Sequence, residues 1–143
     1  MIIELIASAI GTVAFALLFG VPRTYYLHCG AIGAAGWLMY RAILAINMGV
    51  TFAVFFATVV IVLLSRFAAV RRKCPATVFM ITGIFPLVPG AKFYWAAYYL
   101  VTNQIAEFQE SGYSALKIMV AIVLGIIFVF ELPHKFFHLG KGK

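Results

Sequence analysis

The sequence contains very little charge. Only 10% of its 143 residues are Asp, Glu, Lys or Arg, and it has four acidic residues, all of them glutamate. Soluble domains carry about 25% charged residues and are about 45–50% apolar. This chain is 65% hydrophobic and has a mean hydropathy of +1.08. The composition therefore excludes an ordinary soluble domain and indicates an integral membrane protein.

Motifs for enzyme chemistry are also missing from the sequence. It has no GxSxG, no HExxH, no Walker lysine motif and no pair of aspartates within an apolar run. Its two cysteines, Cys29 and Cys74, lack CxxC or CxxH spacing and predict neither a disulfide framework nor a zinc site. His134 and His138 have helical i, i+4 spacing without a third ligand, which is more typical of an interfacial anchor. We expect no enzyme activity, no metal and no cofactor.

The net charge of +7 comes from eleven Lys and Arg residues. Basic proteins often bind nucleic acid, but these cations lie in short clusters at the ends of apolar runs and not on one polar face. In a membrane protein this pattern sets the orientation. We therefore expect a lipid bilayer and no nucleic acid around this chain.

Long apolar runs predict an all-α, polytopic membrane protein with a single domain over residues 1–143. About 20 apolar residues cross a hydrocarbon core of about 30 Å, so the chain has room for four or five helices. The five predicted spans are residues 2–19, 29–46, 50–70, 75–106 and 113–132, followed by a short basic tail. The polar residues 107–112 predict a loop between the last two spans.

The fourth predicted span begins with a broken segment, residues 75–90, which reads PATVFMITGIFPLVPG. Proline removes a backbone donor and glycine loosens a helix, so the freed backbone groups need partners inside protein or beside a water-lined cavity. Transporters commonly build a binding site in this way. Two alternatives stay open, a discontinuous crossing over 75–106 or a re-entrant hairpin at 75–90 followed by a short span.

The charged clusters predict one orientation. If the basic cluster 71–73 is cytoplasmic, alternation of the spans places Arg23 and the basic tail on the same side. Glu4, the turn at Asn47 and the loop with Glu107 and Glu110 then lie outside. This agreement predicts an outside N-terminus and a cytoplasmic C-terminus.

Eight residues are candidate ligands for a substrate. Arg41 is a charge within a predicted span, which indicates a carboxylate ligand, although its side chain could instead reach the interface. The broken segment offers hydroxyls, freed carbonyls and half-helix termini, or else only a structural kink. Its candidates are Thr77, Thr82, Gly83, Pro86, Pro89 and Gly90. Lys92 follows the break, either as a second carboxylate ligand or as an interface anchor.

Small and aromatic residues mark two further helix faces. Gly30, Gly33 and Ala34 permit close approach of another helix, either from this chain or from a partner. Five aromatic residues follow the break and either line a path or form an interface belt. They are Phe93, Tyr94, Trp95, Tyr98 and Tyr99.

Three stretches carry a resemblance to a known family. FGVPRTYY, GAIGAAGWLMY and SRFAAVRRKCPATVFMITGIFPLVPGAKFY resemble the small, C-terminal type domain of the threonine/serine exporter family, including the small subunit of two-component succinate exporters. The resemblance implies secondary export of threonine, serine or dicarboxylates such as succinate across the plasma (inner) membrane of a prokaryote. In single-chain members a second domain is fused on the N-terminal side. The resemblance therefore implies a larger membrane subunit as partner.

Polarity within the predicted spans leads to a similar expectation. About five thin helices offer few groups to replace the hydration of a zwitterion or carboxylate, and an unpaired polar group in hydrocarbon costs several kcal/mol. We therefore expect a partner or self-association. The alternatives to an exporter subunit are a non-transporting scaffold for the larger partner and a self-sufficient homo-oligomeric channel.

Overall fold

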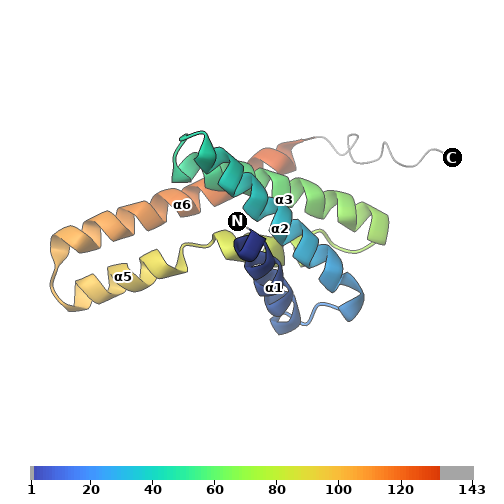
Figure 1. Ribbon diagram of the computed structural model, residues 1–143, viewed down its shortest axis with the longest axis horizontal. Coiled ribbons are helices and arrows are strands. Elements are labelled where there is room, and N and C mark those ends of the chain that lie inside the picture. Colours follow the sequence, from blue (N-terminus) through green and yellow to red (C-terminus); the bar gives the residue numbers. More distant parts are fainter. Residues whose placement is uncertain (1, 133–143) are drawn as a thin grey trace.

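The computed structural model describes residues 2–132, and over this range the regular structure is helical (Figure 1). Its α-helices are α1 (Ile2–Leu18), α2 (Tyr26–Ala45), α3 (Val50–Arg72), α4 (Thr77–Ile84), α5 (Gly90–Val101) and α6 (Ile105–Glu131). Two short 3₁₀ helices, η1 (Arg23–Tyr25) and η2 (Phe85–Leu87), precede α2 and follow α4. The predicted basic tail lies outside the described residues.

Glycines allow α1, α2 and α3 to pack closely as neighbours. A side chain at Gly33 of α2 would collide with Thr12 of α1, and one at Gly36 would collide with Ile61 of α3. Gly30 likewise faces Val13 of α1, and a Cβ added at Gly30 would lie 3.1 Å from the Val13 side chain. The small residues of α2 thus serve packing within this chain, which is one of the two alternatives that the sequence left open.

Helices α3 and α6 run parallel to each other. Gly125 of α6 faces Thr58 of α3, and farther along both helices the Arg66 side chain reaches the Val129 carbonyl. Two parallel helices need a connection that returns to the starting end, and α4, η2 and α5 provide it (Figure 1). The direction of these helices agrees with the predicted alternation of spans.

The predicted break lies at η2. The segment Thr77–Leu87 and α5 differ in direction by 53°. Pro86 lies in η2, and Pro89 immediately precedes α5, so two backbone donors are missing where the helix would continue. The chain is extended at Val88, with ψ of 128°, before α5 begins. The discontinuity predicted for this segment is therefore present.

By length and composition, the described helices include fewer candidate membrane spans than the five that the sequence predicts. Among the described helices, α3 and α6 are long and apolar enough to cross a membrane alone, and the bent pair of Thr77–Leu87 with α5 adds a third if it is one span. Helix α1 is apolar but has 17 residues, and α2 carries His28 and Arg41. The all-helical membrane architecture is confirmed, and the count of five stays a prediction.

The predicted loop at 107–112 is wrong. Helix α5 ends at Val101, not at 106, and α6 already begins at Ile105. A tight turn joins them because Asn103 adopts a left-handed conformation, with φ of +61°. Glu107 then lies in the first turn of α6, where a negative charge interacts favourably with the helix dipole. Similarly, α2 begins at Tyr26, three residues before the predicted span.

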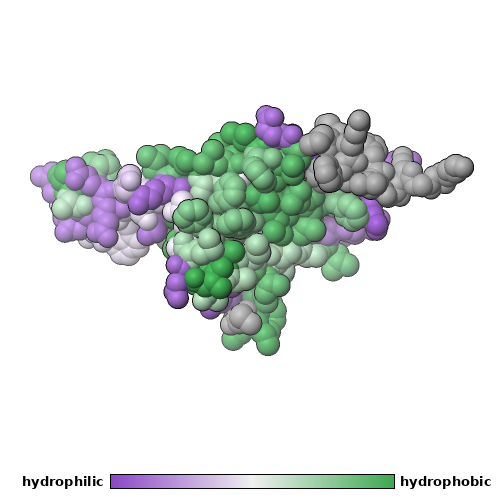
Figure 2. All heavy atoms as spheres, turned by 90° about the horizontal axis from the view of Figure 1, so that it is seen from above, coloured by the Kyte–Doolittle hydropathy of each residue, from purple (hydrophilic) through white to green (hydrophobic). Residues whose placement is uncertain are grey.

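Helix α5 and the first half of α6 form a hairpin that projects from the remaining helices (Figure 1). We call this hairpin, residues 90–117, the arm. Figure 2 shows that the projecting end is largely hydrophilic, whereas the rest of the visible face is largely hydrophobic. Helix α5 packs mainly against α6 and exposes Tyr94, Trp95 and Tyr98. These aromatic side chains contact one another across α5, with Trp95 stacked on Tyr99 at 5.8 Å.

The basic cluster 71–73 lies at the same end of the molecule as the connector that contains Arg23 and His28. The Arg72 guanidinium donates to Nε2 of His28 over 2.9 Å, which joins the beginning of α2 to the end of α3. Glu4 and Arg41 pair at the opposite end of α1 and α2. The relative placement of these clusters agrees with the predicted topology. Which end faces the cytoplasm stays a prediction.

Candidate functional site

The candidate site is the break between α4 and α5, where α4 lies against α1, α2 and α3. Gly83 is buried at this crossing, and a Cβ added there would lie 2.8 Å from Ile61 and 3.2 Å from Ile32. Only glycine lets α4 approach α2 and α3 this closely. Gly83 therefore allows α4, which leads into the break, to lie close against α2 and α3.

A hollow of about 280 Å³ lies beside α4 and brings two predicted residues together. Thr77 and Thr82 are one and a half turns apart and both line it, together with Phe19, Val21, Val78 and Ile81. The Thr82 hydroxyl is buried and donates to the carbonyls of Val78 and Phe79, each over 3.1 Å. Thr82 is only 1% exposed, so little of its surface faces the hollow.

The remaining predicted residues of the break have different surroundings. Pro86 follows Phe85 in η2. The Phe85 ring stacks on the ring of Phe15 of α1, with 3.8 Å between the ring centres, so η2 packs against α1. Pro89 is buried, whereas Gly90 and Lys92 are exposed in the first turn of α5. The structure thus gathers Thr77 and Thr82 in one hollow and places Lys92 at the beginning of the arm.

Arg41 lies apart from the break, in a polar cluster between α1 and α2. Its Nε is 3.3 Å from Oε2 of Glu4, and Nε1 of Trp37 donates to the same oxygen over 3.5 Å. The Arg41 and Glu4 side chains are 43% and 41% exposed. Glu4 occupies the place that a substrate carboxylate would take on Arg41. The role of Arg41 as a ligand stays a prediction.

Buried hydroxyls elsewhere in the helices already have partners. Thr58 donates to the Val54 carbonyl over 2.8 Å, and Ser65 donates to the Ile61 carbonyl over 2.7 Å. Thr12 makes the same kind of bond to Ser8, and Ser8 reaches across to the Gly33 carbonyl. Bonds of this kind satisfy a hydroxyl inside its own helix bundle. Within residues 2–132, Nδ1 of His28 is the buried side-chain atom that lacks a partner.

Arg66 is an important residue that the sequence analysis did not assign. Its side chain is only 6% exposed, and Nη1 donates to the carbonyls of Val129 over 2.6 Å and Leu132 over 3.4 Å. The last carbonyls of a helix have no partner within it and carry partial negative charge. Arg66 therefore caps α6 from α3. The general rarity of arginine inside membrane helices was the available signal.

No group of three or more His, Cys, Asp or Glu side chains in the described part of the chain is placed to hold a metal ion. The predicted pair His134 and His138 lies outside that part. The polar groups that the segment 75–92 contains are the hydroxyls of Thr77 and Thr82, backbone groups and the Lys92 ammonium.

These features define the class of the protein as an all-helical membrane protein with a Pro/Gly-broken helix among its packed helices. The comparison with known families is more specific. Residues 4–131 match the family model described as "Threonine/Serine exporter, ThrE", so the chain belongs to this exporter family. The family resemblance of the sequence is thereby confirmed.

The chain is 31% identical over 142 residues to an uncharacterized protein of Haemophilus influenzae. The match covers 96% of this chain and 48% of the relative, so the chain spans about half the length of that protein. No solved structure matches.

Proposed function

We propose that this chain is a membrane component of a secondary exporter of small amino acids such as threonine and serine, or of dicarboxylates such as succinate. In this proposal a larger membrane partner supplies the other part of the transporter, and the break at 75–90 lines the substrate path. Membership of the exporter family and the hollow beside α4 are the observations that support it.

The break offers groups that suit a carboxylate or a zwitterion. At the beginning of α5 the Gly90 N–H donates to the Val88 carbonyl over 2.8 Å, and the next N–H groups have no helical partner and carry partial positive charge. Lys92 lies in the same turn. Thr77 and Thr82 contribute hydroxyls on the other side of the break. We expect the substrate carboxylate to bind at the beginning of α5, and the threonines to contact the substrate at another point of the path.

A second candidate function is a scaffold subunit that holds the larger partner without touching substrate. The observation that favours it is the internal satisfaction of the buried hydroxyls, because Ser8, Thr12, Thr58 and Ser65 all bond to backbone within this chain. Such a bundle has few polar groups left to replace the hydration of a substrate. The two functions differ in what substitutions at the break do.

Uptake of labelled threonine, serine and succinate into proteoliposomes tests the proposal. The chain alone is compared with the chain co-purified with its partner, and Thr82→Val is compared with the matched control Thr58→Val. Both substitutions replace a buried hydroxyl that bonds to its own helix, but only Thr82 lines the hollow. We expect transport only with both components, and a loss of at least tenfold in Thr82→Val with little change in Thr58→Val.

Other outcomes decide between the alternatives. Equal transport by Thr82→Val, Thr58→Val and wild type, in complexes of unchanged amount, would favour the scaffold. Transport by this chain alone would overturn the two-component proposal and favour a homo-oligomeric channel or carrier. Transport by the partner alone would make this chain dispensable for the transport step.

A further inference from the structure

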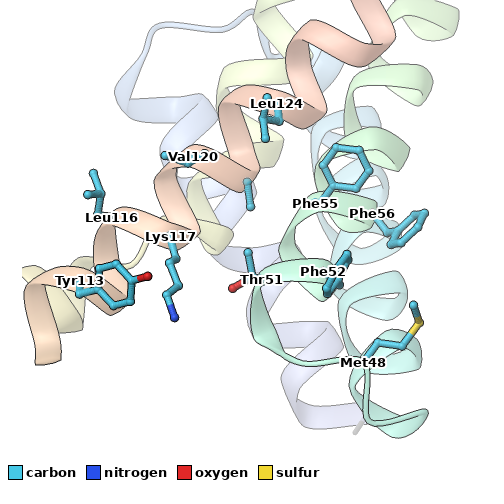
Figure 3. A pocket seen from close by; sticks show the side chains of 11 residues that line it. Met48, Thr51, Phe52, Phe55, Phe56, Tyr113, Leu116, Lys117, Val120 and Leu124 are labelled. Carbon is cyan, nitrogen blue, oxygen red and sulfur yellow. The ribbon is translucent and has the colours of Figure 1, made fainter.

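An apolar groove runs between α3 and the middle of α6, away from the break. Its volume is about 560 Å³. Figure 3 shows side chains from both helices around it, and most of its lining is formed by Phe52, Phe55 and Phe56 of α3 and by Leu116, Val120 and Leu124 of α6. We call it the α3–α6 groove. Its apolar lining does not suit a small zwitterion, because it contains almost nothing to replace the hydration of such a ligand.

One end of this groove carries a cation. Lys117 lines the groove together with Thr51 and Tyr113 (Figure 3). Its ammonium lies 4.2 Å from the centre of the Tyr113 ring, so the side chain bends one turn back along α6 toward the beginning of that helix. No carboxylate in the described chain is within ion-pair distance of Lys117. An anionic ligand group would complement this charge.

A second, more polar hollow adjoins the same end. It has a volume of about 720 Å³ and shares Tyr113 and Lys117 with the groove. Gln109, Glu110 and Ser114 also line it. The apolar groove and the polar hollow meet at Lys117. Together they match the apolar and polar parts of an amphiphilic ligand.

The length of the groove sets the size of the apolar part. Its lining residues on α6 extend from Tyr113 to Leu124. At about 1.5 Å per residue, these eleven steps cover about 16 Å. The hydrocarbon core of a bilayer is about 30 Å thick, so the groove has the depth of one leaflet.

We propose that the α3–α6 groove binds a phospholipid with an amine in its headgroup. One acyl chain lies along the groove between the phenylalanines of α3 and Val120 of α6. The phosphate accepts hydrogen bonds from the Lys117 ammonium, which is the usual charge-assisted contact between lysine and phosphate. Glu110, in the adjoining hollow, favours a positively charged headgroup amine over a second negative charge.

Native mass spectrometry of the full chain, purified in detergent, tests this site with phosphatidylethanolamine and phosphatidylglycerol as probes. Lys117→Met removes the cation, and Val120→Trp fills the groove without a change in charge. Arg23→Met is the matched control, because it also removes one exposed cation but lies in η1. Helicity and monodispersity are measured for each variant, so that loss of binding is read only in folded protein.

We expect wild type and Arg23→Met to retain phosphatidylethanolamine, and both Lys117→Met and Val120→Trp to reduce the bound fraction at least fivefold. Glu110→Gln should raise the retention of phosphatidylglycerol relative to phosphatidylethanolamine. Wild-type retention in Lys117→Met or in Val120→Trp would overturn the site, as would absence of lipid on wild type. The site would also be overturned if the wild-type chain formed a dimer that Val120→Trp dissociated and that added lipid did not affect. That result would assign the groove to a second copy of this chain.

Discussion

The packed helices α1–α4 and the arm are held by different kinds of contact. In α1–α4 the contacts are made by small residues, so that Gly33 meets Thr12 and Gly83 meets Ile61 with no space for a side chain. In the arm, Gly112 has no neighbour within 4 Å of the place a Cβ would take, and Trp95 is 47% exposed. Close packing therefore positions the break, whereas the arm presents large side chains to its surroundings.

The largest expected effect concerns the glycines of α2. Gly33→Val should destabilise the chain by about 1–3 kcal/mol or more, because the new side chain overlaps with Thr12 and the helices must move apart. Thermal unfolding in detergent, followed by circular dichroism, measures this loss.

The matched control is Gly112→Ala in the arm. This position is helical and open, so alanine should be neutral or stabilising by about 0.5–1 kcal/mol. If both variants have the same midpoint as wild type, α1 and α2 are not packed as described and the comparison between the two regions fails.

The next effect concerns the cap on α6. Arg66→Met removes the donor to the Val129 and Leu132 carbonyls, and hydrogen bonds from charged groups contribute about 1.5–3 kcal/mol. We expect a lower unfolding midpoint and faster hydrogen exchange at the end of α6.

Arg71→Met provides the comparison for Arg66. It also removes an arginine of α3, but an exposed one that contacts the Phe67 ring at 4.6 Å, and should cost about 0.5–1 kcal/mol. Equal destabilisation by the two substitutions would contradict the capping role of Arg66.

A smaller effect on stability is expected for the pair of Glu4 and Arg41. Because both side chains are partly exposed, Arg41→Gln and Glu4→Gln should each change stability by about 0.2–1 kcal/mol. Transport separates the two interpretations of Arg41. A ligand role predicts that Arg41→Gln abolishes uptake while Glu4→Gln retains it, whereas equal activity of both variants would leave Arg41 a partner of Glu4 only.

The smallest effect is expected in the exposed face of α5. Tyr94→Ala should alter the stability of the chain alone by about 0.5 kcal/mol or less, since its ring is 65% exposed and contacts only its neighbour Trp95 in the described aromatic network. Co-purification with the partner is the second measurement. Loss of the complex at unchanged stability would identify the arm as part of the interface, and a stability loss as large as that of Gly33→Val would show that the arm is packed like α1–α4.

Several elements of this architecture could be predicted from the sequence because they depend on local chemistry. The break follows from Pro86 and Pro89, which remove backbone donors, and the long apolar run gives α3. The arm could not be predicted, since residues 107–112 have the polar composition of a loop, yet packing against α5 and the favourable position of Glu107 keep them helical. The contact between Arg66 and the end of α6 joins residues more than sixty positions apart, which no local pattern specifies.

The candidate site was predictable to a similar degree. Thr77 and Thr82 lie five residues apart on one short helix, about 140° apart around its axis, so their common hollow also depends on the end of α1, which supplies Phe19 and Val21 beside it. The separation of Arg41 from this hollow depends on how α2 packs against α1, and on a carboxylate, Glu4, that lies far away in the sequence. Tertiary packing decided that outcome.

A substrate path along residues 75–90 requires that this segment be accessible to water and to substrate. Thr77→Cys is made in a chain whose own Cys29 and Cys74 are replaced by alanine, and its reaction with a membrane-impermeant thiol reagent is timed in membrane vesicles, with and without threonine, serine or succinate. We predict labelling that a transported substrate slows at least threefold. Labelling at the same rate with every substrate, or none in vesicles that still transport, would contradict a substrate path along the break.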